Sequence, residues 1–353
     1  MRVLAGDIGG THARLAVVEI DDRQVHLVRE ARYASGDYPS LAPIVRTFLD
    51  AGGDAPSRAA FGVAGPVAGG RVATPNLPWT LDERRLARDI AIPRTRLLND
   101  LDAIARGTAR LVASDFVTLQ EGTADTDGIV ALVGAGTGLG EAFVVRNGGV
   151  ARTHASEGGH TGFAPRTPIE RELLASLAGE FGHVSSERVI SGPGLENIYG
   201  FLAKREPSRE QPAVRGAVQE EGAAAISRHG LDGSDSLCAQ ALDIFVSAYG
   251  AKAGNMALTV LATGGVLLVG GIAPAIVKKL TDGTFLAAFR DKGRMSEMMQ
   301  HMPVRVVMND DVGLYGAATA AAEDDGRASD TPRTPTASGA PFNQSTQRRG
   351  TLT

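Results

Sequence analysis

Two glycine-rich turns, each lying between two apolar runs, constrain the fold of this chain more than any other feature of its sequence. The first turn is GDIGGT at residues 6–11, with apolar runs at residues 3–5 and 13–20 on either side. The same order recurs over residues 128–146, where the turn reads GAGTG. Apolar runs bounded by glycines are typical of buried strands joined by tight turns. The repetition therefore predicts two α/β units, each of which opens with a β-hairpin.

Between the two turns, strand-like and helix-like apolar patterns alternate along the chain. The expected order of elements is β-β-β-α-β-α-β-α, which is typical of an α/β layer fold. The further strands are expected at residues 25–33, 59–64 and 96–98, and the helices at residues 41–49, 81–90 and 100–106.

The second half of the chain reads as mainly helical between residues 168 and 262, with its longest apolar segment at residues 239–261. Residues 204–237 are polar and interrupted, so we expect a loop-rich insertion there. Residues 324–353 carry almost no large apolar side chains, which predicts a disordered tail. The remaining expected elements are strands at residues 266–271 and 304–308, a helix opening at residue 272 and a final helix at residues 312–322.

Charge and cysteine content narrow the class of protein. Lys plus Arg is 36 and Asp plus Glu is 40, so the net charge of −4 argues against a nucleic-acid partner or a membrane-surface partner. The single cysteine, Cys238, excludes a disulfide framework and a Cys-rich zinc site, and it fits a cytoplasmic compartment. No apolar run reaches the roughly 18 residues of a membrane span, and the N-terminus does not read as a signal peptide.

Three glycine clusters follow apolar strands and could bind phosphate. They are residues 6–11, residues 134–138 and the pair Gly270-Gly271. Without Cβ atoms in the way, several backbone N–H groups can point at one anion, and two facing turns could hold a polyphosphate. Asp7 could hold Mg²⁺ directly or through water. The alternative is that these glycines only make tight turns; neither a P-loop nor a Rossmann fingerprint is present.

Several polar side chains are candidates for a binding site but also have a purely structural interpretation. Asn99-Asp100 follows a strand, where the pair could simply cap a helix. Glu157 and His160 flank two glycines and combine a carboxylate acceptor with an imidazole donor. His160 could equally be a capping residue, and Glu187 could be an ordinary exposed charge.

Six segments, in order, resemble those of the ATP-dependent, hexokinase-type bacterial glucokinases: GDIGGTHARL, LLNDLDAIARG, GAGTGLGEA, SEGGHTGFAP, ERVISGPGLENIY and LVGGIAP. The resemblance spans residue 1 to about 320. It implies an α/β fold with two ribonuclease-H-like, actin-like ATPase domains around a cleft, and a homodimer. A small domain would comprise residues 1–108 and 303–322, and a large domain residues 109–302. The related ROK kinases share the glycine turns, but many carry a zinc-binding cysteine cluster that one cysteine cannot form.

The resemblance also assigns roles to residues. It implies transfer of a phosphoryl group from ATP to the 6-hydroxyl of D-glucose, a step of glycolysis, with Asp100 as catalytic base. The sugar would contact Asn99, Asp100, Glu157, His160 and Glu187. Mg-ATP would contact Gly6, Asp7, Ile8, Gly9, Gly10, Thr11, Gly134, Gly136, Thr137, Gly138, Gly270 and Gly271, with Asp7 on the metal side.

Some alternatives stay open at the level of sequence. A kinase for another hexose or for an N-acetylhexosamine would need few changes in the pocket, and a non-enzymatic sugar-sensing regulator could use the same fold. His12 stands where we expect Asn in the first phosphate turn, and Pro75 adds rigidity before the loop near the sugar. Asp102 is given only a structural role.

Overall fold

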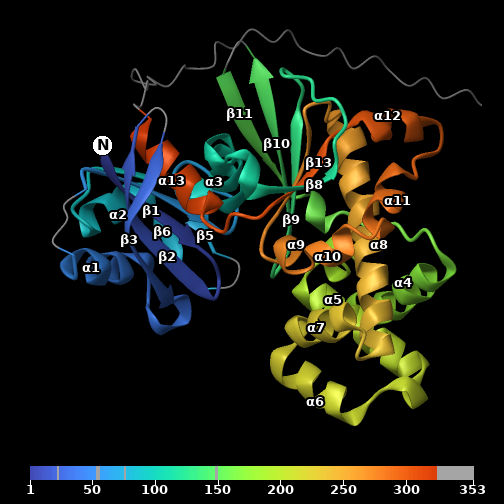
Figure 1. The fold of residues 1–353 in the computed structure, drawn as a ribbon. Coiled ribbons are helices and arrows are strands. Elements are labelled where there is room, and N and C mark those ends of the chain that lie inside the picture. Colours follow the sequence, from blue (N-terminus) through green and yellow to red (C-terminus); the bar gives the residue numbers. More distant parts are fainter. Residues whose placement is uncertain (22–23, 53–55, 75–76, 148–149, 324–353) are drawn as a thin grey trace, which may run out of the picture. The chain divides into compact units, whose positions relative to one another are not determined.

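The computed structural model describes residues 1–21, 24–52, 56–74, 77–147 and 150–323. Residues Met1–Ala322 form one compact unit (Figure 1). The segment predicted to be a disordered tail, residues 324–353, lies outside the described residues, and so does Pro75. The division at residues 108 and 303 stays a prediction, because the compact unit contains both of the proposed parts.

The first half of the chain builds a five-stranded sheet in the order β3-β2-β1-β4-β7. The first three strands pair in antiparallel fashion, and β1, β4 and β7 are parallel. Helix α1 buries its apolar face against this sheet, as its spacing predicts. The strands are β1 (Arg2–Ile8), β2 (His12–Ile20), β3 (Val25–Ala34), β4 (Arg58–Val63) and β7 (Arg94–Asn99); the helices are α1 (Leu41–Asp50) and α2 (Glu83–Asp89), and β5 (Arg71–Ala73) with β6 (Thr80–Asp82) forms a separate hairpin.

The second sheet repeats this topology, which confirms the predicted duplication. Its order is β11-β10-β9-β12-β13-β8, with an antiparallel hairpin pair followed by three parallel strands. Strand β8 is an addition at the edge, antiparallel to β13. The strands are β8 (Phe116–Gln120), β9 (Val130–Ala135), β10 (Leu139–Asn147), β11 (Val150–Ser156), β12 (Gly265–Val269) and β13 (Val304–Val307).

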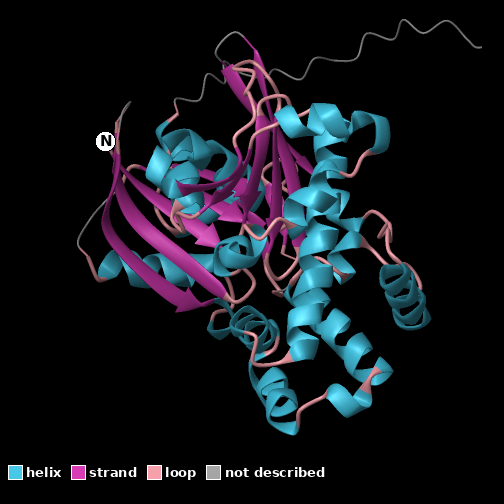
Figure 2. Ribbon diagram, turned by 45° about the vertical axis from the view of Figure 1, so that its right-hand side comes forward, coloured by secondary structure: helices cyan, strands magenta, loops and turns pink. Residues whose placement is uncertain are grey.

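Helices cover the second sheet and extend beyond it (Figure 2). Helix α8 is buried on most sides and lies at the centre of the largest apolar core. Among the described residues, no helix is long and apolar enough to cross a membrane. The helices are α4 (Pro168–Phe181), α5 (Gly192–Arg205), α6 (Pro212–Glu221), α7 (Ala223–Asp232), α8 (Ser236–Val260), α9 (Ile272–Ala275), α10 (Val277–Leu280), α11 (Thr284–Arg290) and α12 (Ser296–His301).

The expected loop-rich insertion at residues 204–237 is wrong. Helices α6 and α7 occupy most of it, and Gly222, with φ +59°, makes the turn between them. The two helices bury only Val214, Ala225 and Ile226, and they turn their polar side chains to solvent. So few buried positions leave a weak periodic signal in the sequence, and tertiary packing stabilises helices that the pattern alone does not reveal.

Two helices, α3 (Asp100–Gly107) and α13 (Val312–Ala322), pack at unusually close range. A Cβ atom on Gly316 would overlap the backbone carbonyl of Ala103, and one on Gly107 would overlap the carbonyl of Val312. Helix α13 also packs its small side chains on the first sheet, so that it lies beside β1, the first strand of the chain (Figure 1). The helix that begins at Asp100 is therefore fixed by backbone-to-backbone contact.

We expect Gly316→Ala to destabilise the protein by about 1–3 kcal/mol, because the added methyl group meets backbone that cannot rotate away. Gly200→Ala is the matched control. Gly200 also lies inside a helix, but a Cβ atom there meets nothing within 4 Å, so its change should be neutral or stabilising by up to about 1 kcal/mol. Thermal unfolding of both variants measures the difference; equal melting temperatures would contradict the packing described for α3 and α13.

Candidate active site

The carboxylates of Asp7 and Asp100 lie at the carboxyl ends of parallel strands of the first sheet. Asp7 is near the end of β1, and Asp100 begins α3 immediately after β7. Strand β4 runs between them and carries Gly62 opposite Asp7. A Cβ atom on Gly62 would lie 2.8 Å from the Cβ of Ala103 and 3.6 Å from the Cα of Asp100. The missing side chain of Gly62 thus lets the first turn of α3 approach the sheet.

The pair Asn99-Asp100 does cap a helix, as the structural interpretation predicts. The Asn99 Oδ1 accepts a hydrogen bond from the Leu101 N–H at 3.0 Å, and its Nδ2 donates to the Gly65 carbonyl at 3.0 Å. The Asp100 Oδ1 accepts from the same Leu101 N–H at 2.9 Å. Capping does not exclude chemistry, because an amide or carboxylate oxygen can accept a second hydrogen bond. The caps hold both side chains in fixed positions.

The pKa of Asp100 is raised to about 6, chiefly by burial and also by the negative charges of Asp7 and Glu157, while the hydrogen bond from the Leu101 N–H lowers it. Burial also raises the pKa of Asp7, while the nearby Arg14 guanidinium lowers it. A carboxyl group with a pKa near 6 is mostly ionised at neutral pH but holds a proton more readily than an ordinary Asp. Such a group is suited to accepting a proton during a reaction.

Glu157, His160 and Glu187 come together, although Glu187 is distant from the others in sequence. The His160 Nε2 lies 3.6 Å from the Glu157 Oε2, and its Nδ1 lies 4.0 Å from the Glu187 Oε1. The Glu157 and His160 side chains are largely exposed, whereas that of Glu187 is 30% exposed. Since the charge of Glu157 also acts on Asp100, one region holds acidic and imidazole groups with free hydrogen-bonding capacity.

The second glycine turn lies directly against this group. The Glu187 Oε2 accepts a hydrogen bond from the Leu139 N–H at 2.9 Å, and a Cβ atom on Gly138 would lie 2.5 Å from the same oxygen. Gly270 has φ +82° and lies against the Ala135 carbonyl. The second and third glycine clusters therefore meet at the carboxyl ends of β9 and β12.

The proposed nucleotide-binding residues divide into exposed and buried ones. Gly6, Ile8 and Gly134 are buried inside strands. A Cβ atom on Gly6 would overlap the Phe61 ring, so this glycine makes room for packing within the sheet. The residues that have solvent access in the turns are Asp7, Gly9, Gly10, Thr11, Gly136, Thr137, Gly138, Gly270 and Gly271.

Arg14 is a residue of this region that the sequence analysis missed. It faces Asp7 across β1 and β2, and its side chain pairs with Asp311 at 2.6 Å and with Glu30 at 2.7 Å. It also donates to the Asp310 carbonyl at 2.8 Å, just before α13. A lone arginine in a strand forms no motif, so only the register of the hairpin could have indicated its place opposite Asp7.

Comparisons with known proteins show what the whole chain is similar to. A family model described as Glucokinase matches residues 4–324. A glucokinase from Nostoc sp. is 42% identical over 337 residues, which is 91% of this chain and 98% of that protein. The crystal structure of a glucokinase from an Antarctic psychrotroph is similar with a TM-score of 0.77 and 32% identity, over 91% of this chain and 98% of that one.

A more distant structure shares the fold. It is a ROK family glucokinase from Streptomyces griseus in complex with glucose and AMPPNP, with a TM-score of 0.65 and 21% identity. The match covers 91% of this chain and 99% of that chain. At this identity, the likeness concerns the fold alone.

The raised pKa of Asp100 predicts a cost in stability at neutral pH. Between the ordinary Asp value of 3.8 and about 6, the folded state binds more protons at this group than the unfolded state does, so stability falls as pH rises through that window. Asp100→Asn removes the charge, and we expect its melting temperature at pH 7.5 to exceed that of the wild type by roughly 1–3 °C.

The advantage of Asp100→Asn should shrink as the pH falls toward 4, where the wild-type carboxyl is protonated as well. Asp102→Asn is the matched control, because Asp102 lies on the same helix and pairs with Arg106 at 3.0 Å. It should show no gain at neutral pH. A wild type that is more stable than Asp100→Asn at pH 7.5 would show that the ionised Asp100 carboxylate does not destabilise the folded state.

Proposed function

The chain belongs to the glucokinase family of ATP-dependent sugar kinases, and we propose that Asp100 is the base that accepts the proton of the glucose 6-hydroxyl. The reaction transfers the γ-phosphoryl group of ATP to glucose and yields glucose 6-phosphate and ADP. A sugar hydroxyl is a poor nucleophile until it loses its proton. The observation that carries the proposal is the position of Asp100, held at the start of α3 with its pKa raised to about 6.

The environment of Asp100 explains why this carboxylate would be an effective base. A base works best when its pKa lies near the working pH, because it is then ionised yet still binds a proton strongly. The neighbouring charges of Asp7 and Glu157 favour protonation of Asp100. Proton uptake from the hydroxyl therefore relieves repulsion in the site at the moment the oxygen attacks.

Four further residues would orient the sugar. Asn99 is fixed by its hydrogen bonds to Gly65 and Leu101, and it would present the remaining lone pair of its amide oxygen to a sugar hydroxyl. Glu157 and Glu187 lie 3.6 Å and 4.0 Å from the His160 imidazole, so the three side chains supply acceptors and a donor in one place. The match to the Glucokinase family model and the 42% identity to the Nostoc glucokinase support glucose as the sugar.

The glycine turns would bind ATP, and Asp7 would contribute to binding Mg²⁺. The exposed parts of the turns offer backbone N–H groups without Cβ atoms, which suits phosphate oxygens. An ion at Asp7 would take this one carboxylate and several substrate oxygens or waters, as Mg²⁺ commonly does. The repulsion between Asp7 and Asp100 also favours a cation there. When bound, Mg²⁺ would neutralise the developing charge on the phosphates.

The wider setting belongs to the same proposal. We propose a cytoplasmic homodimer that supplies glucose 6-phosphate to glycolysis, as the resemblance implies. The single, buried cysteine fits a reducing compartment. Size-exclusion chromatography with light scattering tests the dimer, and a panel of glucose, mannose and N-acetylhexosamines tests the preference for glucose. Phosphorylation of another sugar with a higher kcat/KM than glucose would overturn the substrate assignment.

Asp100→Asn should lower kcat for glucose phosphorylation by roughly 10²–10⁴-fold, the usual contribution of a general base. The amide keeps the shape of the side chain, so ATP and glucose should still bind. Asp102→Asn, two residues further along α3, should stay close to the wild-type kcat. A coupled assay of glucose 6-phosphate formation measures both. An Asp100→Asn enzyme that retains more than about a tenth of wild-type kcat would assign the proton to another group.

The charge of Asp7 should be visible in the pH profile. Wild-type kcat/KM should rise as pH increases through about 6, the pKa of Asp100. Asp7→Asn removes one of the charges that raise this pKa, so the acidic limb should move to lower pH while kcat falls for lack of the metal ligand. The profile is taken as kcat/KM for Mg-ATP, because this ratio reports the enzyme before the ion that would neutralise Asp7 has bound. An unmoved or upward-shifted limb would show that Asp7 does not act on Asp100.

A further inference from the structure

A buried ion pair links the second glycine turn to helix α8. Glu141 lies in β10, two residues after Leu139, and its side chain is 3% exposed. Its Oε1 lies 3.1 Å from the Nζ of Lys252, whose side chain is 13% exposed. Burial raises the pKa of Glu141, and the ammonium group lowers it. Two charges so far out of water are costly to keep, and removal of one partner would leave the other uncompensated.

Lys252 also holds the segment that carries His160. Its Nζ donates to the Gly158 carbonyl at 2.8 Å and to the Thr161 Oγ1 at 3.0 Å. These two residues flank the single helical turn of Gly158–His160. The carboxylate of Glu141 occupies the space that a side chain on Gly158 would need. One ammonium group therefore anchors both ends of this turn to the sheet and to α8.

Residues of this segment and of α8 line a pocket of about 310 Å³. The turn also packs on the sheet, because Gly159 is buried against the Leu139 carbonyl. On its other side, the Ser186 N–H donates to the Thr161 carbonyl at 2.8 Å. The hydrogen bonds of Lys252 add a third attachment, from the side of α8. Lys252 and Glu141 both line the pocket, next to the turn.

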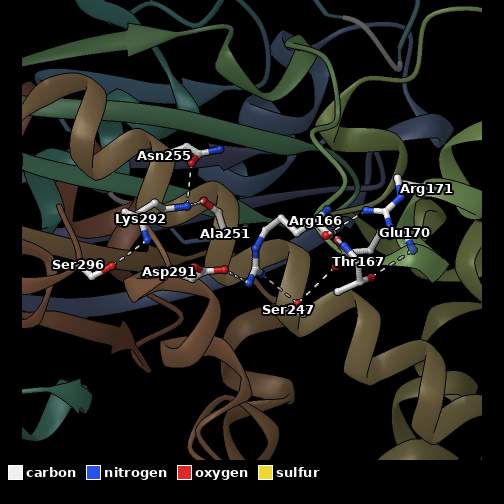
Figure 3. A network of polar contacts seen from close by, with 10 residues as sticks. All are labelled: Arg166, Thr167, Glu170, Arg171, Ser247, Ala251, Asn255, Asp291, Lys292 and Ser296. Carbon is white, nitrogen blue, oxygen red and sulfur yellow. Dashed lines mark hydrogen bonds and ion pairs between the residues drawn. The ribbon is translucent and has the colours of Figure 1, made fainter. Parts of the chain in front are cut away.

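The far end of the segment is attached to α8 independently. Figure 3 shows Arg166 extending between Ser247 of α8, at 3.3 Å, and Asp291, at 2.7 Å. Beyond it, Lys292 donates to the Ala251 carbonyl and to Asn255 on the same helix. Helix α8 is thus held in place on both sides of residue 252. A loss of Lys252 would remove the attachment to α8 at the end that bears His160, while the hydrogen bond from Ser186 to Thr161 and the attachment of the other end stay in place.

We propose that Lys252, neutralised by Glu141, is a positioning residue that sets the height of the 158–161 turn and so brings His160 and Glu157 to the sugar. The inference rests on the proposed sugar-binding role of these two residues. It makes glucose affinity depend on a side chain that touches neither substrate. The two residues of the pair have different roles in this proposal. Lys252 makes the contacts to the turn, and Glu141 compensates the charge of Lys252.

The test compares Lys252→Met with the double variant Glu141→Gln/Lys252→Met. The single change leaves a buried carboxylate without its partner and should lower the melting temperature strongly. The double change removes both charges, so it should recover most of that stability. Neither variant restores the contacts to Gly158 and Thr161, so KM for glucose should stay at least about tenfold above the wild-type value in both, with KM for ATP changed less than about twofold.

Lys279→Met is the matched control. Lys279 pairs with Asp243, which also lies on α8, and it has a second partner in Asp282. Its loss should leave KM for glucose unchanged. A double variant with wild-type KM for glucose would overturn the positioning role and leave the pair with a stabilising role only. A wild-type enzyme that does not phosphorylate glucose would instead overturn the proposed function, so the two failures are distinct.

Discussion

The site depends on two carboxylates that the fold holds close together against their mutual repulsion. Asp7 and Asp100 stand at the ends of parallel strands, and each has a pKa raised chiefly by burial. Isolated in water, neither would hold a proton at neutral pH. The sheet register, the missing side chain of Gly62 and the capped start of α3 fix their positions. Burial and repulsion destabilise the charged form of Asp100. The same effects raise its pKa and so make it the stronger base that the proposed chemistry needs.

Glycine is used in this protein where backbone must meet backbone or side chain. Gly316 and Gly107 let α13 and α3 touch, and Gly158 lets the Glu141 carboxylate lie under the turn that carries His160. In each case glycine is needed because a Cβ atom would overlap the neighbouring atoms. The same logic applies to Gly138 beside Glu187, where a turn proposed to bind phosphate meets a residue proposed to bind sugar. Close contact of the two would place the donor and the acceptor in neighbouring positions.

Local patterns in the sequence predict most of the fold and the identity of the main polar residues. The strands around each glycine turn are long apolar runs, so they could be recognised, as could the amphipathic helix α1. Strand β11 was missed because it is an exposed edge strand with a polar sequence. Helices α6 and α7 were missed because they bury so few side chains. A sequence pattern indicates a helix or strand through the spacing of its buried apolar residues, and these three elements bury few of them.

The environment of the site could not be predicted in the same way. Asn99-Asp100 is visible as a motif, but the pKa of Asp100 depends on Asp7 and Glu157, which only the folded chain brings near. Glu141 lies in a strand and Lys252 in a helix far along the chain, so no regular spacing in the sequence indicates that the two side chains pair. Resemblance to a family supplies the roles of individual residues. The physical reasons for those roles come from distances, burial and charge.

A direct titration of the Asp100 carboxyl tests the central claim. Carbon-13 NMR of protein labelled at the Asp side-chain carboxyl carbons, with Asp100→Asn for assignment, reports the protonation of this group without relying on activity. We expect a midpoint near pH 6 in the wild type and a lower midpoint in Asp7→Asn. A midpoint near the ordinary Asp value of 3.8 would show that neither burial nor the Asp7 charge makes this carboxylate unusually basic.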